Sequence, residues 1–230
     1  MRIAFLGASL TEGSYGGSYV NALRGRLTAH TLLNHGVNGS TMNRLLERVD
    51  AVLDDAPDVV FILAGSNDAI AYAAPKTRGY YRKAQELPEG YIEPHDFAQM
   101  YRDLLTRFQL AHVQAVVGLP PLEYNPAVAE AARTFNAAAT EAARAFNLPV
   151  CDLYTPLMPA HIPDRRPLDL NSVMLIGERV KSGWHDYDME RLRGGYTYSF
   201  DGIHFTPQAA ERAAQLIADC LHDALGLDIT

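Results

Sequence analysis

Three residues near the two ends of this 230-residue chain have side chains that can cooperate in nucleophilic chemistry. Near the C-terminus, "FDGIHFTP" places Asp201 three residues before His204, and Gly202 permits a tight turn between them. A turn of that spacing can hold the carboxylate against Nδ1–H of the ring, which leaves Nε2 free for a hydroxyl group. Near the N-terminus, "GASLTEG" supplies such a hydroxyl on Ser9, directly after an apolar run.

Each of these residues also has a simpler interpretation when taken alone. Ser9 could be a turn residue, a helix cap or part of a phosphate-binding loop. Asp201 and His204 could mark the entry to a helix, with the histidine on the surface. The segment "HDYD" at 185–188 is interpreted as a solvated loop, because its spacing does not suggest a metal site. The elements that carry these residues must therefore decide between the interpretations.

The pattern of apolar residues predicts strands that alternate with helices. Short apolar runs predict strands at residues 3–6, 31–34, 59–64, 113–119 and 150–153. Apolar residues at spacings of three and four predict helices at residues 42–53, 126–146 and 207–225. Asn125 is placed to cap the second of these helices, and Gly226 to end the third. Such an alternation predicts an α/β fold, with a parallel sheet of about five strands covered by helices on both faces.

Several polar segments follow the predicted strands directly. In a parallel sheet the carboxyl ends of the strands share one edge, and functional groups gather where the strand order reverses. Ser9 follows the first strand, "GVNGST" with Asn38 and Gly39 follows the second, and "AGSND" with Asn67 and Asp68 follows the third. If the first strand lies between the second and the third, both loops flank Ser9. Asn67 alone could be a turn residue, and Asp68 is interpreted as structural, capping the next segment.

Four segments in this order resemble the SGNH hydrolases, the superfamily of GDSL-type esterases and lipases. "GASLTEG" stands for the first block of that superfamily, "GVNGST" for the second, "AGSND" for the third and "DGIH" for the last. The resemblance covers residues 1 to about 155 and about 199 to the end. It implies a flavodoxin-like three-layer α/β/α sandwich and an enzyme that cleaves carboxylic esters through an acyl-enzyme intermediate.

The resemblance also implies roles for individual residues. Ser9 would be the nucleophile, His204 the general acid and base, and Asp201 the residue that orients His204. The backbone N–H groups of Ser9 and Gly39, with the side-chain amide of Asn67, would form the oxyanion hole, in which each donor is typically worth ~3 kcal/mol of barrier. One position departs from the family pattern: Ala8 stands where the family has aspartate. That carboxylate is outside the triad, so we expect the chemistry to survive and the bracing of the loop to differ.

Composition sets broader limits on function. A net charge of −7 without a basic cluster argues against nucleic acid as a partner, and the chain lacks a long apolar run for stable membrane insertion. Cys151 and Cys220 are read as reduced thiols, and no targeting segment is evident, so we expect a cytoplasmic protein. A small-molecule ester is the expected partner, and the mechanism requires no cofactor or metal. The oligomeric state stays open.

We expect residues 1–230 to form a single domain with insertions at about 70–95 and 156–200, which are rich in Tyr, Pro, Gly and charge. Aromatic residues of the second insertion either wall a substrate pocket or pack the insertion onto the sheet; they are Trp184, Tyr187, Tyr196 and Tyr198. Two rival functions stay open on the same fold. One is a flavin-binding electron-transfer module in which "SLTEG" cradles a phosphate. The other is a catalytically dead binding protein, for which Ala8 is the only hint.

Overall fold

A computed structural model describes residues 1–229, with the side chains of all of these except residues 170, 172, 173 and 176. In this part of the chain, five parallel strands form one sheet in the order β2-β1-β3-β4-β5. The strands are β1 Arg2–Gly7, β2 Thr31–Gly36, β3 Val59–Leu63, β4 Gln114–Leu119 and β5 Val150–Asp152. The predicted α/β fold is confirmed, including the position of the first strand between the second and the third.

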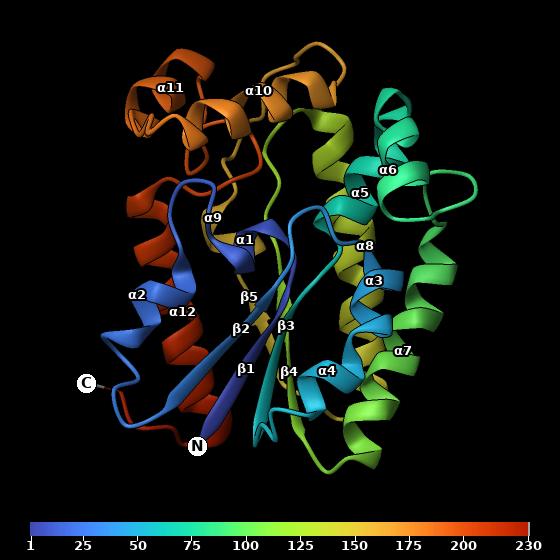
Figure 1. The fold of residues 1–230 in the computed structure, drawn as a ribbon, viewed down its shortest axis with the longest axis vertical. Helices are drawn as coiled ribbons and strands as arrows, with labels where there is room; N and C mark the ends of the chain where they lie inside the picture. The colour runs from blue at the N-terminus through green and yellow to red at the C-terminus, as the bar shows by residue number, and fades with distance from the viewer. Residues whose placement is uncertain (230) are drawn as a thin grey trace.

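Helices cover both faces of this sheet. They are α1 Ser9–Glu12, α2 Tyr19–Arg24, α3 Met42–Glu47, α4 Val49–Leu53, α5 Ser66–Ala73, η1 Pro75–Thr77, α6 Arg78–Ala84, α7 Pro94–Leu110, α8 Pro126–Ala145, α9 Tyr154–Leu157, α10 Leu170–Lys181, α11 Tyr187–Gly194 and α12 Pro207–Leu225. Figure 1 shows α2 and α12 on one face and α3, α7 and α8 on the other. The layers are those of a flavodoxin-like sandwich.

The strand pleat explains why two cores form. Alternate residues of a strand point to opposite faces of the sheet, so an apolar run fills both. In β1, Ile3 and Phe5 pack toward α2 and α12, whereas Ala4 and Leu6 pack toward α3, α7 and α8. Every residue of β3 is buried. The central strands are therefore held from both sides.

The register of the strands sets the level of the loops that follow them. Gly7 at the end of β1 pairs with Gly36 of β2 on one side and with Leu63 of β3 on the other. The three strands thus end side by side, and the loops that leave them begin at one edge. Figure 1 shows α10 and α11 beyond this edge, at the opposite end of the molecule from the two chain termini.

Two local predictions need correction, and one helix was not predicted. The segment predicted as one helix at 42–53 forms two helices, with Arg48 between them. The side chain of Arg48 turns to the sheet and donates to backbone carbonyls there. The segment 185–188 is helical in its second half, since α11 begins at Tyr187. Helix α7 lies in a stretch for which no helix or strand was predicted, and it is the longest helix on its face of the sheet after α8.

Candidate active site

The loop that carries Ser9 is a single short helical turn on the end of β1. Ser9 is the first residue of α1, so its backbone N–H has no partner within the helix. Gly7 packs so tightly that a Cβ there would lie 2.1 Å from Oγ1 of Thr11. Asn34 of β2 donates its side-chain amide to the carbonyl of Thr11 at 2.8 Å. Close packing and this hydrogen bond fix the height of Ser9 above the sheet.

The turn before α12 brings Asp201 and His204 together. Oδ1 of Asp201 accepts from the backbone N–H of Ile203 at 2.9 Å and of His204 at 2.7 Å. Oδ2 lies 2.7 Å from Nδ1 of the His204 ring. Gly202 allows this turn because its φ is +86° and because a Cβ there would meet the backbone of Tyr124 at 2.7 Å. The carboxylate therefore both closes the turn and orients the ring.

The two ends of the chain meet at the hydroxyl of Ser9. Nε2 of His204 lies 2.9 Å from Oγ of Ser9, although the two residues are 195 positions apart in the sequence. All three side chains are buried, with exposed fractions of 8% for Ser9, 4% for His204 and 7% for Asp201. A ring held by a carboxylate on one nitrogen can accept a hydroxyl proton on the other. This arrangement can activate Ser9 as a nucleophile.

Gly39 and Asn67 reach the same edge from the loops after β2 and β3. Gly39 has a φ of +76°, which residues with a side chain rarely adopt, and a Cβ there would lie 2.4 Å from the Tyr80 hydroxyl, so the position favours glycine. The Asn67 amide is fixed at both ends: Tyr81 donates its hydroxyl to Oδ1 at 2.8 Å, and Nδ2 donates to the carbonyl of Ser40 at 3.1 Å. Since Nδ2 carries two protons, one stays available for a bound oxyanion.

A cavity of about 190 Å³ joins these groups. Its lining residues are Ser9, Tyr15, Asn38, Gly39, Asn67, Ile70, Tyr80, Tyr81, Met174, Ile203 and His204. Four of the five predicted site residues line this cavity: Ser9, Gly39, Asn67 and His204. The fifth, Asp201, lies behind the His204 ring. Sequence reasoning missed Tyr15, Tyr80 and Tyr81. No spacing could have identified Tyr81, because its role depends on a contact with Asn67 that only the fold creates.

Asp68 is structural, but it does not cap the next segment. Its Oδ1 accepts from the backbone N–H of Met42 at 3.0 Å, so it caps the start of α3, which precedes it in the chain. Asp68 is only 1% exposed, and burial raises the pKa of its carboxyl to about 7. The contact ties the Asn67 loop to the Gly39 loop.

The aromatic residues of the segment 156–200 pack against one another and the sheet. Trp184 and Tyr187 make ring contacts with each other and with Phe200, and Tyr198 packs on Phe205. Of the four candidates for a pocket wall, all of them described, none lines the cavity at Ser9. The packing interpretation therefore holds for that cavity.

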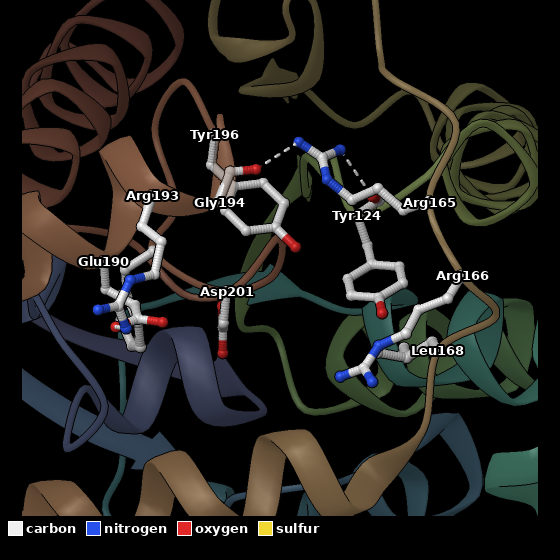
Figure 2. A pocket seen from close by; sticks show the side chains of 10 residues that line it. Tyr124, Arg165, Arg166, Leu168, Glu190, Arg193, Gly194, Tyr196 and Asp201 are labelled. Atoms are coloured by element: carbon white, nitrogen blue, oxygen red, sulfur yellow. Dashed lines mark hydrogen bonds and ion pairs between the residues drawn. The ribbon is translucent and has the colours of Figure 1, made fainter.

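A second and larger cavity, of about 400 Å³, lies on the other side of the Asp201 turn. Tyr196, Arg165, Arg166 and Arg193 line it, and it reaches Asp201 but not Ser9. Figure 2 shows Arg165 bonded to the carbonyl oxygens of Tyr124 and Gly194, across one wall of this cavity. Because the larger cavity lacks Ser9 and His204, the smaller one is the candidate active site.

Within the described residues, no group of three or more His, Cys, Asp or Glu side chains is placed to hold a metal ion. Across residues 1–229, no helix has both the length and the apolar character needed to cross a bilayer.

The fold is a flavodoxin-like α/β/α sandwich that brings a serine, a histidine and an aspartate into line at one edge of its sheet. The chain belongs to the GDSL-like lipase/acylhydrolase family, whose model matches residues 5–212. The predicted resemblance is thus confirmed at the level of the family. No match was found among curated proteins.

Solved structures with the same fold include three enzymes. A GDSL-like lipase from Bacteroides thetaiotaomicron is 18% identical, with a TM-score of 0.64 over 97% of this chain and 89% of that one. The lipase/acylhydrolase from Enterococcus faecalis is 19% identical, with a TM-score of 0.61 over 96% and 95%. An acetyl xylan esterase variant from Geobacillus stearothermophilus is 16% identical, with a TM-score of 0.63 over 100% and 96%. At these identities the likeness concerns the fold.

Proposed function

We propose that this chain hydrolyses carboxylic esters through an acyl-enzyme intermediate on Ser9. The observation that carries the proposal is the continuous chain of contacts from Asp201 Oδ2 to His204 Nδ1, at 2.7 Å, and from His204 Nε2 to Ser9 Oγ, at 2.9 Å. Membership of a lipase and acylhydrolase family supports the same reaction class.

The first half of the reaction forms the acyl-enzyme. Oγ of Ser9 attacks the acyl carbon while Nε2 of His204 takes the hydroxyl proton. The carbonyl oxygen becomes an oxyanion, which the N–H groups of Ser9 and Gly39 and the Asn67 amide stabilise. The intermediate then breaks its bond to the alkoxy oxygen, and the alcohol leaves with the proton from His204.

The second half restores the enzyme. Water attacks the acyl carbon and gives a proton to His204, and the bond to Ser9 Oγ breaks as the proton returns to that oxygen. The acid leaves, and the site is ready for another ester. Asp201 keeps the ring in place throughout and stabilises the imidazolium that forms in each half.

The cavity suggests the kind of ester. Among the described residues that line it, none is Lys, Arg, Asp or Glu, so a charged acyl group would be buried there without a partner. A volume of about 190 Å³ favours a short neutral acyl group. The acetyl xylan esterase among the structural neighbours is consistent with a short acyl group. We therefore propose a small neutral ester as substrate.

The test combines turnover with active-site labelling. We expect the wild type to hydrolyse p-nitrophenyl acetate and butyrate faster than palmitate, and a fluorophosphonate probe to modify Ser9, as located by mass spectrometry. Ser9→Ala should lose both properties. Ser14→Ala is the matched control, because Ser14 is an exposed serine near the same loop. A protein with no turnover and no label would instead be a binding protein on this fold.

A further inference from the structure

Glu123 is a buried carboxylate that contacts the segment leading into the Asp201 turn. It lies after β4 and is only 2% exposed. Its Oε1 accepts from the backbone N–H groups of Tyr198 at 3.0 Å and Ser199 at 2.9 Å, and from the Ser199 hydroxyl at 2.6 Å. The N–H of Thr197 reaches Oε2 at 2.8 Å and Oε1 at 3.0 Å. Three consecutive N–H groups thus converge on one side chain.

Glu123 is a buried carboxylate without a cationic ion-pair partner among the described residues. Among the ion pairs of the described residues, none includes the Glu123 carboxylate, and the groups that contact its oxygens are N–H and O–H donors. Burying an ionised carboxylate is costly unless hydrogen bonds replace its lost water. An apolar residue there would leave the backbone N–H groups of Thr197, Tyr198 and Ser199 without this acceptor. The hydrogen bonds are therefore what this residue contributes.

These hydrogen bonds continue into the turn itself. Oγ of Ser199, which donates to Glu123, accepts from the backbone N–H of Gly202 at 2.9 Å. The carbonyl of Gly202 accepts from the backbone N–H of Glu123 at 3.2 Å. Gly202 lies between Asp201 and His204. Glu123 therefore holds both backbone polar groups of Gly202, the carbonyl through its own backbone N–H and the N–H through Ser199.

Arg165 holds the start of the same segment. Its guanidinium donates to the carbonyl of Tyr124 at 2.8 Å and to that of Gly194 at 2.9 Å (Figure 2). It also donates to the carbonyl of Gly195 at 2.9 Å. It also lies over the ring of Tyr196, 4.2 Å from its centroid. The segment 194–199 is thus fastened to residues 123–124 at both of its ends, and the turn follows at once.

We propose that Glu123 is a positioning residue for the reaction: it sets the place of Asp201 and His204 relative to Ser9 through Ser199 and Gly202. The inference rests on the proposed function for the reaction that it serves. A ring displaced by a fraction of an ångström no longer accepts the Ser9 proton efficiently, because proton transfer needs a short and aligned hydrogen bond. Binding of the ester depends on other residues of the cavity and should change little.

The experiment compares Glu123→Gln and Ser199→Ala with the wild type. Glu123→Gln keeps the shape but replaces one acceptor oxygen by an NH₂ group and removes the charge. Ser199→Ala keeps the carboxylate and removes only its link to Gly202, so it tests the same path if Glu123→Gln does not fold. Ile217→Val in α12 is the control for lost stability alone, since Ile217 is fully buried among other residues of its helix face.

Two quantities are measured well below the melting temperature. The first is the hydrolysis of p-nitrophenyl acetate, for which we expect kcat to fall about tenfold or more in both variants and KM to stay within about twofold. The second is the proton magnetic resonance of the His204 ring N–H that faces Asp201. We expect that signal to shift or broaden in both variants and to stay unchanged in Ile217→Val.

Folded variants that keep wild-type kcat and an unchanged ring N–H signal would overturn the inference. If the wild type itself hydrolyses no ester and takes no label at Ser9, the proposed function fails. In that case the His204 ring N–H signal tests the role of Glu123 separately. A change of the signal in both variants supports the positioning role, and an unchanged signal contradicts it.

Discussion

Asp68 shows how a single buried residue can make the stability of the site depend on pH. Burial raises the pKa of its carboxyl from 3.8 to about 7. In the unfolded chain the group loses its proton near its ordinary value, so between these two values the folded state binds more protons. Since stability falls with pH wherever the folded state binds more protons, Asp68 lowers the free energy of unfolding as pH rises through this window. Above it, the loss is complete.

Asp68→Asn tests this effect. The amide cannot ionise, and its oxygen can still accept from the N–H of Met42. We expect the melting temperature of the variant, relative to the wild type, to rise between about pH 5 and about pH 8. Thermal unfolding at both values measures the difference. A constant difference across this range would show that Asp68 is ionised in both states.

Tyr81 is a second residue whose effect depends on one hydrogen bond. Its hydroxyl donates to Oδ1 of Asn67, which keeps the Nδ2 group turned toward Ser40 and the cavity. We expect Tyr81→Phe to lower kcat about tenfold, equivalent to about 1.4 kcal/mol of barrier, because the amide can then rotate.

Tyr101→Phe is the matched control for Tyr81→Phe. The Tyr101 hydroxyl is buried, and the described residues provide no hydrogen-bond partner for it. Removing it should leave kcat unchanged and hold or raise the melting temperature, because an unsatisfied buried group is lost. Equal effects of the two variants on kcat would mean that the Asn67 contact does not matter for turnover.

At the scale of elements, the break between α3 and α4 supports the edge of the sheet. The guanidinium of Arg48 donates to the carbonyl of His35 in β2 at 2.7 Å and to that of Gly7 in β1 at 3.1 Å. It also donates to the Ser40 hydroxyl at 3.3 Å. Gly7 precedes the Ser9 loop, so one side chain joins both strand ends to the loop that carries Gly39.

Arg48→Lys should separate these connections. The ammonium group is a single point and cannot span three acceptors as the planar guanidinium does. Hydrogen bonds to charged groups are worth about 1.5–3 kcal/mol each, so we expect a loss of about 2 kcal/mol or more in the free energy of unfolding. Denaturant titration measures it. Arg24 is exposed, and among the described residues its guanidinium makes one hydrogen bond, to the Leu32 carbonyl at 3.3 Å, which an ammonium group can also make. Arg24→Lys should therefore change stability by less than about 0.5 kcal/mol, and a loss as large as that of Arg48→Lys would contradict the explanation.

At the scale of the whole molecule, we propose that the chain is a single domain, with the segment 156–200 as part of it. Trp184 is the only tryptophan of the sequence and lies in this segment. It contacts Phe200 at a centroid distance of 6.1 Å and packs under Arg179. Its fluorescence therefore reports on this segment, whereas far-ultraviolet circular dichroism reports on all helices and strands.

A single domain should unfold in one cooperative step. We expect the fluorescence transition of Trp184 and the circular dichroism transition to share one midpoint in urea. A fluorescence transition at clearly lower urea would show that residues 156–200 unfold as a separate unit.

The sequence by itself determined most of the scaffold. The periodicity of strands and helices depends on residues a few positions apart, so it can be predicted from the sequence alone. The five strands and the caps at Asn125 and Gly226 follow from such local patterns. The apolar residues of α7 also recur at spacings of three and four, in Phe97, Tyr101, Leu104 and Phe108, so this helix was predictable although no element was predicted there. Four motifs in order were enough for the family.

Only the tertiary structure decided what supports the site. Glu123 contacts residues 74 to 76 positions away, and Arg48 contacts Gly7 41 positions away. Whether a polar side chain is solvated or buried against distant backbone groups depends on the packing of whole elements, which no local pattern encodes. Ser9, Asn67 and His204 could be predicted as site residues because each lies in a short sequence motif. The residues that hold those groups in place became visible only when the chain was folded.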